Sequence, residues 1–254
     1  MLAYEDAHMT TIQIRRSNMR TIKNTPIPLL ALVFVAAAGC ATKGVRDATY
    51  NPQIDPANFT AGVVDNAFFP LVPGTVFTFI EKSKGETSEN IVEVTKETKM
   101  IMGVKCVVVH DVVKENGRVT EDTYDWFAQD KQGAVWYFGE DTKEFSSRGK
   151  INTAGSWVAG INGHPGIIMP AHPTPGEPYR QEYSPNNAED MGQVVAVDEI
   201  VTVPYGTFTG CVKTREWSPL EGGSENKWYA RDIGCIRAKG SGGGIEELVS
   251  VKHE

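Results

Sequence analysis

Two groups of side chains have residue types suited to ligand chemistry. His164, Met169 and His172 offer two imidazoles and a thioether, donors that suit copper in an oxidising compartment. The prolines between them exclude a shared helix face, and scattered histidines in such segments more often bind nothing. The second group is five carboxylates that could bind calcium or act as an acid–base pair: Glu121, Asp122, Asp125, Glu140 and Asp141. Acidic residues at strand ends are more commonly a solvated rim, so the sequence allows either metal and requires neither.

The segment 149–193 is the place where a binding site is expected first. It is rich in glycine and proline and too long for an ordinary connection. Long loops over a rigid scaffold tend to carry binding residues, and four side chains here are candidates for contact with a ligand: Trp157, Tyr179, Glu182 and Tyr183. The alternative is a proline-stiffened strap that covers one open end of a sheet.

Common catalytic motifs are absent from the sequence. It contains no GxSxG, HExxH, CxxC, P-loop or GxGxxG pattern, so the common hydrolase, metalloprotease, redox and nucleotide-binding classes lose support. No catalytic residue is assigned, and a binding protein is favoured over an enzyme. An envelope hydrolase that uses carboxylates or a metal near 149–193 is the alternative.

The elements that must position these residues follow a period of two rather than 3.6. Strands are predicted at 75–82, 89–98, 104–114, 118–128, 133–139, 142–147, 193–203, 207–216, 225–230, 233–239 and 245–251. Turn signals such as Asn116-Gly117 and Tyr205-Gly206 separate them, and no segment reads as a long amphipathic helix. The sequence therefore predicts an all-β fold, an antiparallel meander curled into a barrel, half-barrel or sandwich.

A weak internal repeat suggests that the sheet is pseudo-duplicated. Cys106-Val107 and Cys211-Val212 are each followed by an acidic, aromatic strand and then by a glycine that opens the next strand. The alternative is that all hairpins with aromatic strands look alike. Pairing of Cys211 with Cys235 needs a strongly curled sheet, pairing of Cys106 with Cys211 needs the two halves to meet, and all three thiols could be free.

The amino-terminal 40 residues resemble the signal peptide and lipobox of bacterial lipoproteins. Arg20 and Lys23 precede an apolar stretch and then the residues Ala-Ala-Gly-Cys, which end at Cys40. The stretch from 27 to 38 contains a proline and is shorter than the roughly 20 residues that span a bilayer. The resemblance implies a true start at Met19, removal of residues 1–39 and acylation of Cys40. Because aspartate does not follow Cys40, it also implies the outer membrane, on its periplasmic or surface side.

The composition limits the partners. The net charge is −7, and removal of residues 1–39 makes it −9, so the exported chain has no basic footprint for nucleic acid. Only acyl chains would hold it to a membrane. Residues 40–65 are polar and interrupted by proline, which suits a tether, and 66–254 are predicted to form one β domain with 149–193 as an insertion.

Several stretches, among them EDTYDWFAQD and RQEYSPNNAEDM, resemble a group of uncharacterised bacterial exported proteins and lipoproteins. The closing hairpins are more loosely similar to lipocalin-like or open-barrel envelope lipoproteins. Neither resemblance transfers a catalytic residue. We therefore expect a lipid-anchored envelope β domain that binds a small apolar or glycan-type ligand or a protein partner. A purely structural envelope component, with a filled core and no pocket, is the remaining alternative.

Overall fold

The computed structural model describes residues 50–254, so the predicted signal peptide and Cys40 lie outside the described residues. Apart from a short 3-10 turn at Pro56–Asn58 (η1), residues 50–254 form fifteen strands: β1 (Thr75–Ser83), β2 (Glu86–Ile101), β3 (Val104–Glu115), β4 (Arg118–Gln129), β5 (Val135–Phe145), β6 (Ile151–Asn152), β7 (Trp157–Val158), β8 (His164–Met169), β9 (Tyr179–Arg180), β10 (Glu182–Tyr183), β11 (Met191–Val203), β12 (Gly206–Trp217), β13 (Glu225–Ala230), β14 (Gly234–Gly240) and β15 (Ile245–His253). No helix within this range is long and apolar enough to cross a membrane.

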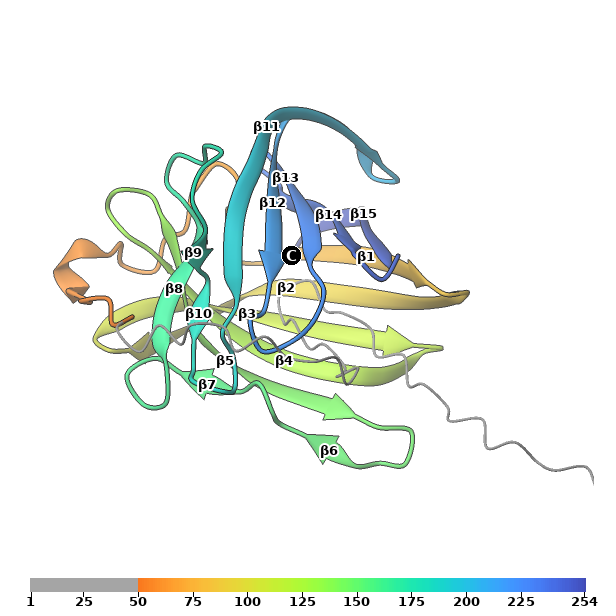
Figure 1. Ribbon diagram of the computed structural model, residues 1–254, viewed down its shortest axis with the longest axis horizontal. Helices are drawn as coiled ribbons and strands as arrows, with labels where there is room; N and C mark the ends of the chain where they lie inside the picture. The colour runs from red at the N-terminus through yellow and green to blue at the C-terminus, as the bar shows by residue number, and fades with distance from the viewer. Residues whose placement is uncertain (1–49) are drawn as a thin grey trace, which may run out of the picture.

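The strands form one antiparallel sheet that curls into a nearly closed barrel (Figure 1). Its order is β10-β8-β5-β4-β3-β2-β1-β15-β14-β13-β12-β11-β9, with β6 and β7 added to β5. The two ends of this order, β9 and β10, are joined in the chain by Gln181 alone. The predicted all-β barrel is thus confirmed, and we call the β9–β10 junction the seam.

Strict alternation of side chains decides which face of each strand points into the barrel. On β2 the inward positions are Ser88, Asn90, Val92 and Val94, and all four are buried. In the register of β2 and β3, Asp111 on β3 lies opposite Val92. A carboxylate therefore occupies the same inward face as a row of valines.

One predicted turn is wrong. The sequence placed a break between strands 133–139 and 142–147, but β5 runs without interruption through Gly139, which has φ 126°. A side chain at this position would overlap the main chain of Trp157 on β7, which pairs with β5 there. Gly139 therefore permits a close approach of two strands and does not end one.

Two segments predicted as irregular pack into the barrel. The 149–193 segment contains β6 to β10, and β8 pairs with β5 as a full member of the sheet. Residues 50–65, expected to belong to the tether, lie against the barrel: Phe59 packs edge-on against Trp136 and Phe138, and Val64 is buried. The folded body therefore extends at least to residue 50.

The two predicted repeat units correspond to β3–β4–β5 and β12–β13–β14, each a three-stranded meander within the one sheet. Their cysteines do not meet. Cys106 and Cys211 are buried, Cys235 is half-buried, and all three thiols are free. Of the arrangements that the sequence left open, the structure has the one with no disulfide among these three.

The β11–β12 hairpin projects from the sheet and bends over its outer face (Figure 1). Positive φ angles at Asp198 and Gly210 accompany the bend. The N–H of Tyr205 at its tip donates to the carbonyl oxygen of Leu248 on β15 (3.1 Å). Arg237 on β14 also donates to the carbonyl oxygen of Thr202, so the hairpin contacts both β14 and β15.

Candidate functional site: an acidic cluster inside the barrel

The barrel interior has an apolar half and an acidic half. The chain from Val64 to Leu71 plugs one end and supplies buried Phe68 and Phe69 to the apolar half. Toward the other end, ten buried carboxylates belong to strands or residues that line the interior: Glu81, Asp111, Glu121, Asp125, Glu140, Glu182, Asp190, Glu216, Glu225 and Glu246. We call these ten the acidic cluster. Among residues 50–254, Lys227 is the one buried lysine or arginine that accompanies them.

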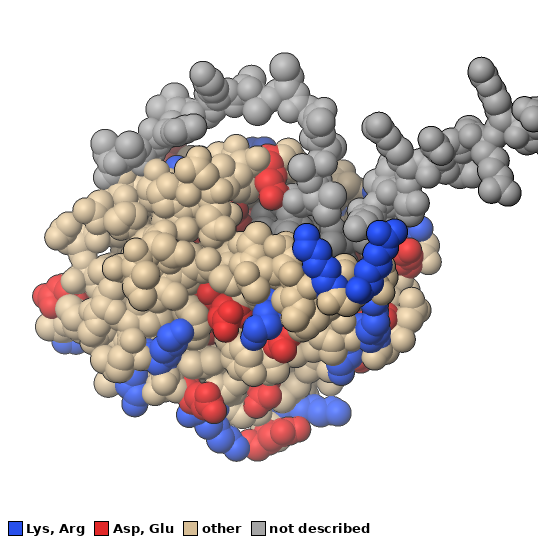
Figure 2. All heavy atoms as spheres, turned by 90° about the horizontal axis from the view of Figure 1, so that it is seen from below, with Lys and Arg blue, Asp and Glu red and all other residues tan. Residues whose placement is uncertain are grey.

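The outer surface does not share this imbalance. On the face shown in Figure 2, Lys and Arg side chains of the described residues are interspersed with Asp and Glu, and neither sign covers a broad area. Exposed charges of mixed sign are screened by water and salt, whereas buried charges of one sign repel strongly in a low dielectric. The unusual excess of acidic groups is therefore inside the barrel.

Part of the acidic cluster is stabilised by Lys227. Its ammonium nitrogen lies 2.9 Å from Glu216 Oε2 and 3.6 Å from Glu225 Oε2. Tyr229 O–H and Thr214 O–H both donate to Glu216 Oε1 (3.0 and 2.7 Å). These contacts make Lys227, Glu216 and Glu225 a buried ion-paired network on β12 and β13.

A first acceptor group, made of Asn90, Asp111 and Glu246, has no such donor. The side-chain amide of Asn90 donates to Glu246 Oε1 (3.2 Å). Asn90 Oδ1, both oxygens of Asp111 and Glu246 Oε2 are buried without a hydrogen-bond partner. All four are acceptors, so none can satisfy another unless a carboxyl is protonated. Burial, with repulsion from neighbouring carboxylates, raises the pKa of Asp111 and of Glu246 well above the usual range.

A second acceptor group, Asp125 and Glu140, lies on β4 and β5. The two residues face each other in register, and Tyr137 O–H donates to Asp125 Oδ1 (2.6 Å). Asp125 Oδ2 and Glu140 Oε2 are buried without partners. Burial raises the pKa of Asp125 to about 7, and burial together with repulsion from Glu182 raises that of Glu140. In this group, one oxygen of each carboxyl group therefore lacks a donor.

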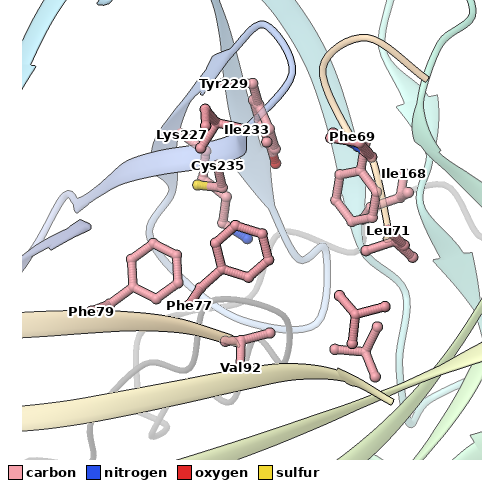
Figure 3. A pocket seen from close by; sticks show the side chains of 14 residues that line it. Phe69, Leu71, Phe77, Phe79, Val92, Ile168, Lys227, Tyr229, Ile233 and Cys235 are labelled. Atoms are coloured by element: carbon pink, nitrogen blue, oxygen red, sulfur yellow. The ribbon is translucent and has the colours of Figure 1, made fainter. Parts of the chain in front are cut away.

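An apolar cavity lies in the barrel interior, and the charged residue among its lining is Lys227 (Figure 3). Its volume is about 50 Å³, and Phe69, Leu71 and Ile168 face Phe77, Phe79 and Val92 across it. Val92 lies opposite Asp111 in the β2–β3 register, and Val109, which also lines the cavity, lies opposite Asp125 in the β3–β4 register.

Three of the four residues expected to bind a ligand lie near the acidic cluster. The indole N–H of Trp157 donates to Glu182 Oε2 (2.6 Å), and both side chains are buried. The hydroxyl of Tyr179 is buried without a partner, and burial raises its pKa. Tyr183 lies apart from them, because it follows Glu182 on β10 and faces the other way, where it contacts Tyr50 and His164. None of these four lines the apolar cavity.

The three residues proposed as copper ligands do not come together. His164 stacks on Tyr183, whereas Met169 is fully buried and pairs with Val135 on β5. His172 lies beyond the strand and is exposed. Within residues 50–254, no three His, Cys, Asp or Glu side chains are grouped as a metal site.

The five carboxylates proposed for calcium or acid–base chemistry divide between the two faces of the sheet. Glu121, Asp125 and Glu140 point inward and belong to the acidic cluster. Asp122 points outward and accepts from His110 Nε2 (2.8 Å), and Asp141 is exposed. The sequence thus indicated part of the cluster but not its inward face as a whole.

Sequence reasoning missed Asp111, Glu216, Glu225, Lys227 and Glu246. A usable signal was present in the run VVVHDVV, which places Asp111 on the same strand face as Val109 and Val113. A carboxylate on the apolar face of a strand is rare enough to deserve notice, because its burial without a partner is unfavourable.

Comparison with models of known protein families finds no match for this chain, and no curated protein matches it. Among solved structures, the chain is similar to a protein described as a candidate lipoprotein from Parabacteroides distasonis ATCC 8503. The identity is 16% and the TM-score 0.44, over 74% of this chain and 99% of that chain. At these values the likeness assigns this chain neither a family nor an activity.

Proposed function

We propose that this protein is a lipid-anchored binding protein of the bacterial envelope and that its barrel binds a small organic cation. Asp111 is the observation that carries the proposal: its side chain is 1% exposed and neither oxygen has a partner at hydrogen-bond distance, although the nearby Asn90 amide and the Lys227 charge oppose the effect of burial on the pKa of Asp111. An orphaned carboxylate in the interior costs several kcal/mol unless it is protonated or meets a cation. A bound ammonium group supplies both the missing donors and the missing charge.

The chemistry of the acceptors favours a cation over the apolar or glycan-type ligands expected from the sequence. An apolar molecule could fill the cavity beside Val92 but would leave Asp111 without a donor. Sugar hydroxyls could donate hydrogen bonds, but they are neutral and would leave buried charges of one sign uncompensated. An aliphatic amine satisfies both requirements, since its carbon chain suits the cavity and its ammonium group suits the first acceptor group.

The sequence alone supports the proposed location in the envelope. The Ala-Ala-Gly-Cys motif ending at Cys40 and the short apolar stretch before it favour export and acylation. Native membranes should therefore yield a protein that begins at Cys40 and partitions into detergent, and Cys40→Ser should release it or leave the signal peptide attached. An unprocessed chain that begins at Met1 in native membranes would contradict this location.

Calorimetry of the purified mature protein at neutral pH tests the ligand class. We expect n-butylamine to bind and n-butanol, which has a hydroxyl in place of the ammonium, not to bind. Asp111→Asn should weaken amine binding by roughly 10- to 100-fold, the effect of losing a charge-assisted hydrogen bond. Asp141→Asn, which removes an exposed carboxylate from β5, is the matched control.

Two results would contradict the proposal. Equal binding of n-butanol and n-butylamine would assign the interior to apolar ligands, and an unchanged affinity in Asp111→Asn would place the amine elsewhere. Recovery of a chemically altered amine would instead favour the alternative that the carboxylates catalyse a reaction. Recovery of the unchanged amine is expected.

A further inference from the structure

We infer that one side of the barrel rests on the bilayer, with four exposed apolar side chains inserted among the lipids: Val63, Met100, Met102 and Ile161. This inference rests on the proposed location in the envelope, but it does not depend on the ligand of the barrel. The four side chains are 56%, 64%, 41% and 82% exposed, respectively, so apolar surface faces water in the free protein. Insertion among lipids would remove this surface from water.

Two turns that are distant in sequence bring three of these side chains together. Met100 and Met102 belong to the β2–β3 turn, and Ile161 belongs to the turn between β7 and β8. A Cβ atom at Gly160 would lie 2.8 Å from Cγ of Met102, so the two turns touch. Their exposed apolar side chains therefore lie on the same side of the barrel.

The amino-terminal segment brings the fourth side chain to the same place. A Cβ atom at Gly62, next to Val63, would lie 3.2 Å from the side chain of Lys105. Lys105 in turn lies opposite Met100 in the β2–β3 register. Scattered exposed apolar residues need no explanation, whereas apolar residues that three segments gather in one place indicate an interaction site.

The position of the proposed lipid anchor selects a bilayer as the partner. Tyr50 O–H donates to the carbonyl oxygen of Pro165 (2.9 Å), near the start of β8 and close in sequence to Ile161. Figure 1 shows the described chain beginning, in orange, on the side of the barrel where β7 and β8 lie. Cys40 is ten positions before Tyr50, and a chain spans at most about 3.6 Å per residue, so the acylated residue lies within roughly 36 Å of Tyr50. The anchor therefore keeps this side of the barrel close to the bilayer.

The charges around the apolar side chains have both signs. Lys99 and Lys105 flank the β2–β3 turn and are exposed. Glu97 on the same strand and Asp55 at the start of η1 are exposed as well. Anionic headgroups would attract the first pair and repel the second. The contact should therefore depend on apolar insertion and change little with lipid charge or in about 0.5 M salt, which screens exposed charges.

A fluorescent label at one of the four positions tests the contact. We would place the mature acylated variant Ile161→Cys, labelled with an environment-sensitive dye, in vesicles of phosphatidylethanolamine and phosphatidylcholine. Brominated acyl chains should quench this label at least about twofold, because insertion reaches the boundary between headgroups and acyl chains. Ile200→Cys is the matched control, since Ile200 is 73% exposed on the β11–β12 hairpin, which projects on the opposite side in Figure 1. Its label should not be quenched, and the unsubstituted protein measures any labelling of the native thiols.

A second measurement separates insertion from tethering. Met100→Ser and Ile161→Ser together leave the anchor in place and remove two of the apolar side chains. A dye on Met102→Cys then reports the contact, and its quenching should fall by at least about half in this background, because less apolar area is buried in the lipid. Unchanged quenching would show that the tether alone brings this side to the bilayer and would overturn the inference.

The outcomes separate this inference from the proposed location. If the mature protein does not sediment with the vesicles, the location fails and the inference fails with it. If it sediments while the Ile161→Cys label stays unquenched, the location stands and the inference is overturned. Equal quenching of the Ile161→Cys and Ile200→Cys labels would also overturn it, because no side of the barrel would be preferred. Blue-shifted emission in native membranes but not in vesicles would assign this side to a membrane protein and overturn the lipid contact. A cooperative melt verifies that each variant is folded.

Discussion

At the scale of single residues, the interior combines two kinds of buried charge that behave differently. Glu216 accepts from Lys227, Tyr229 and Thr214, so its charge is compensated within the protein. Asp111 has the same burial but no ion pair, and neither of its oxygens has a partner at hydrogen-bond distance. A fully paired carboxylate stabilises a particular packing of its neighbours, whereas an orphaned one destabilises the free protein and is explained best by a function.

Replacement of Lys227 by methionine should test the buried charge that is compensated within the protein. Met is apolar and about as long as Lys, but it leaves Glu216 and Glu225 buried without their cation. We expect the free energy of unfolding to fall by about 3–5 kcal/mol, the usual cost of breaking a buried ion pair from one side. Urea denaturation measures this, with Lys252→Met at an exposed position as the control. A loss below about 1 kcal/mol would show that the ion pairs of Lys227 contribute little to stability.

The sequence revealed individual members of the site better than the site as a whole. Glu182 and Trp157 stood out because they lie in an unusual glycine- and proline-rich segment, and they do form a buried hydrogen bond. Asp111 and Glu246 lie in ordinary strands, distant in sequence. Their proximity depends on how the barrel closes, which period-two alternation does not encode.

At the scale of elements, long strands were predictable and short ones were not. Strands such as β3 and β12 alternate over a dozen positions and end at glycine turns, so their bounds were found to within one or two residues. β7, β9 and β10 have two residues each, too few to show a period. They exist because longer strands pair with them, so 149–193 reads as a loop although it completes the barrel.

Gly166 on β8 should be essential for the seam. A Cβ atom at this position would overlap the main chain of Gln181 and Arg180, which are held against β8. Gly166→Ala should therefore force the seam apart and lower the thermal midpoint by several degrees. Gly176→Ala is the control, because a Cβ there meets nothing closer than 3.7 Å. An unchanged melt in Gly166→Ala would mean that the seam contributes little to stability.

At the scale of the whole molecule, the barrel interior formed by residues 50–254 holds ten carboxyl groups against one ammonium group, whereas the outer face shown in Figure 2 carries charges of both signs. Burial raises the pKa of Asp125 and of Glu225 to about 7, and that of Asp190 to about 6. Each is above the value in an unfolded chain, so the folded protein holds more protons than the unfolded one between about pH 4 and pH 7. Without ligand, stability must therefore fall as the pH rises through this window.

Thermal unfolding at pH 5 and pH 8 measures this dependence. The ligand-free protein should melt at a higher temperature at pH 5, with each unit of raised pKa worth about 1.4 kcal/mol per group. The combined variant Asp111→Asn, Glu246→Gln should reduce the difference, and Glu97→Gln should leave it unchanged. A bound amine should raise the melting temperature more at pH 8 than at pH 5, because it replaces protons that the cluster has lost. Greater stability of the ligand-free protein at pH 8 would contradict the raised pKa values.

If the chain is exported as proposed, its three free thiols determine how long it survives. Burial raises the pKa of Cys106 to about 12 and that of Cys211 and Cys235 above their usual range. Since the thiolate is the form that reacts, the folded barrel holds all three in an inert state even where oxidants are abundant. Unfolding exposes three thiols at once, an odd number, so at least one remains available to another molecule after any pairing within residues 50–254. In an oxidising compartment each excursion to the unfolded state can then become permanent through cross-linking, and the working lifetime is set by the rate of unfolding rather than by its equilibrium.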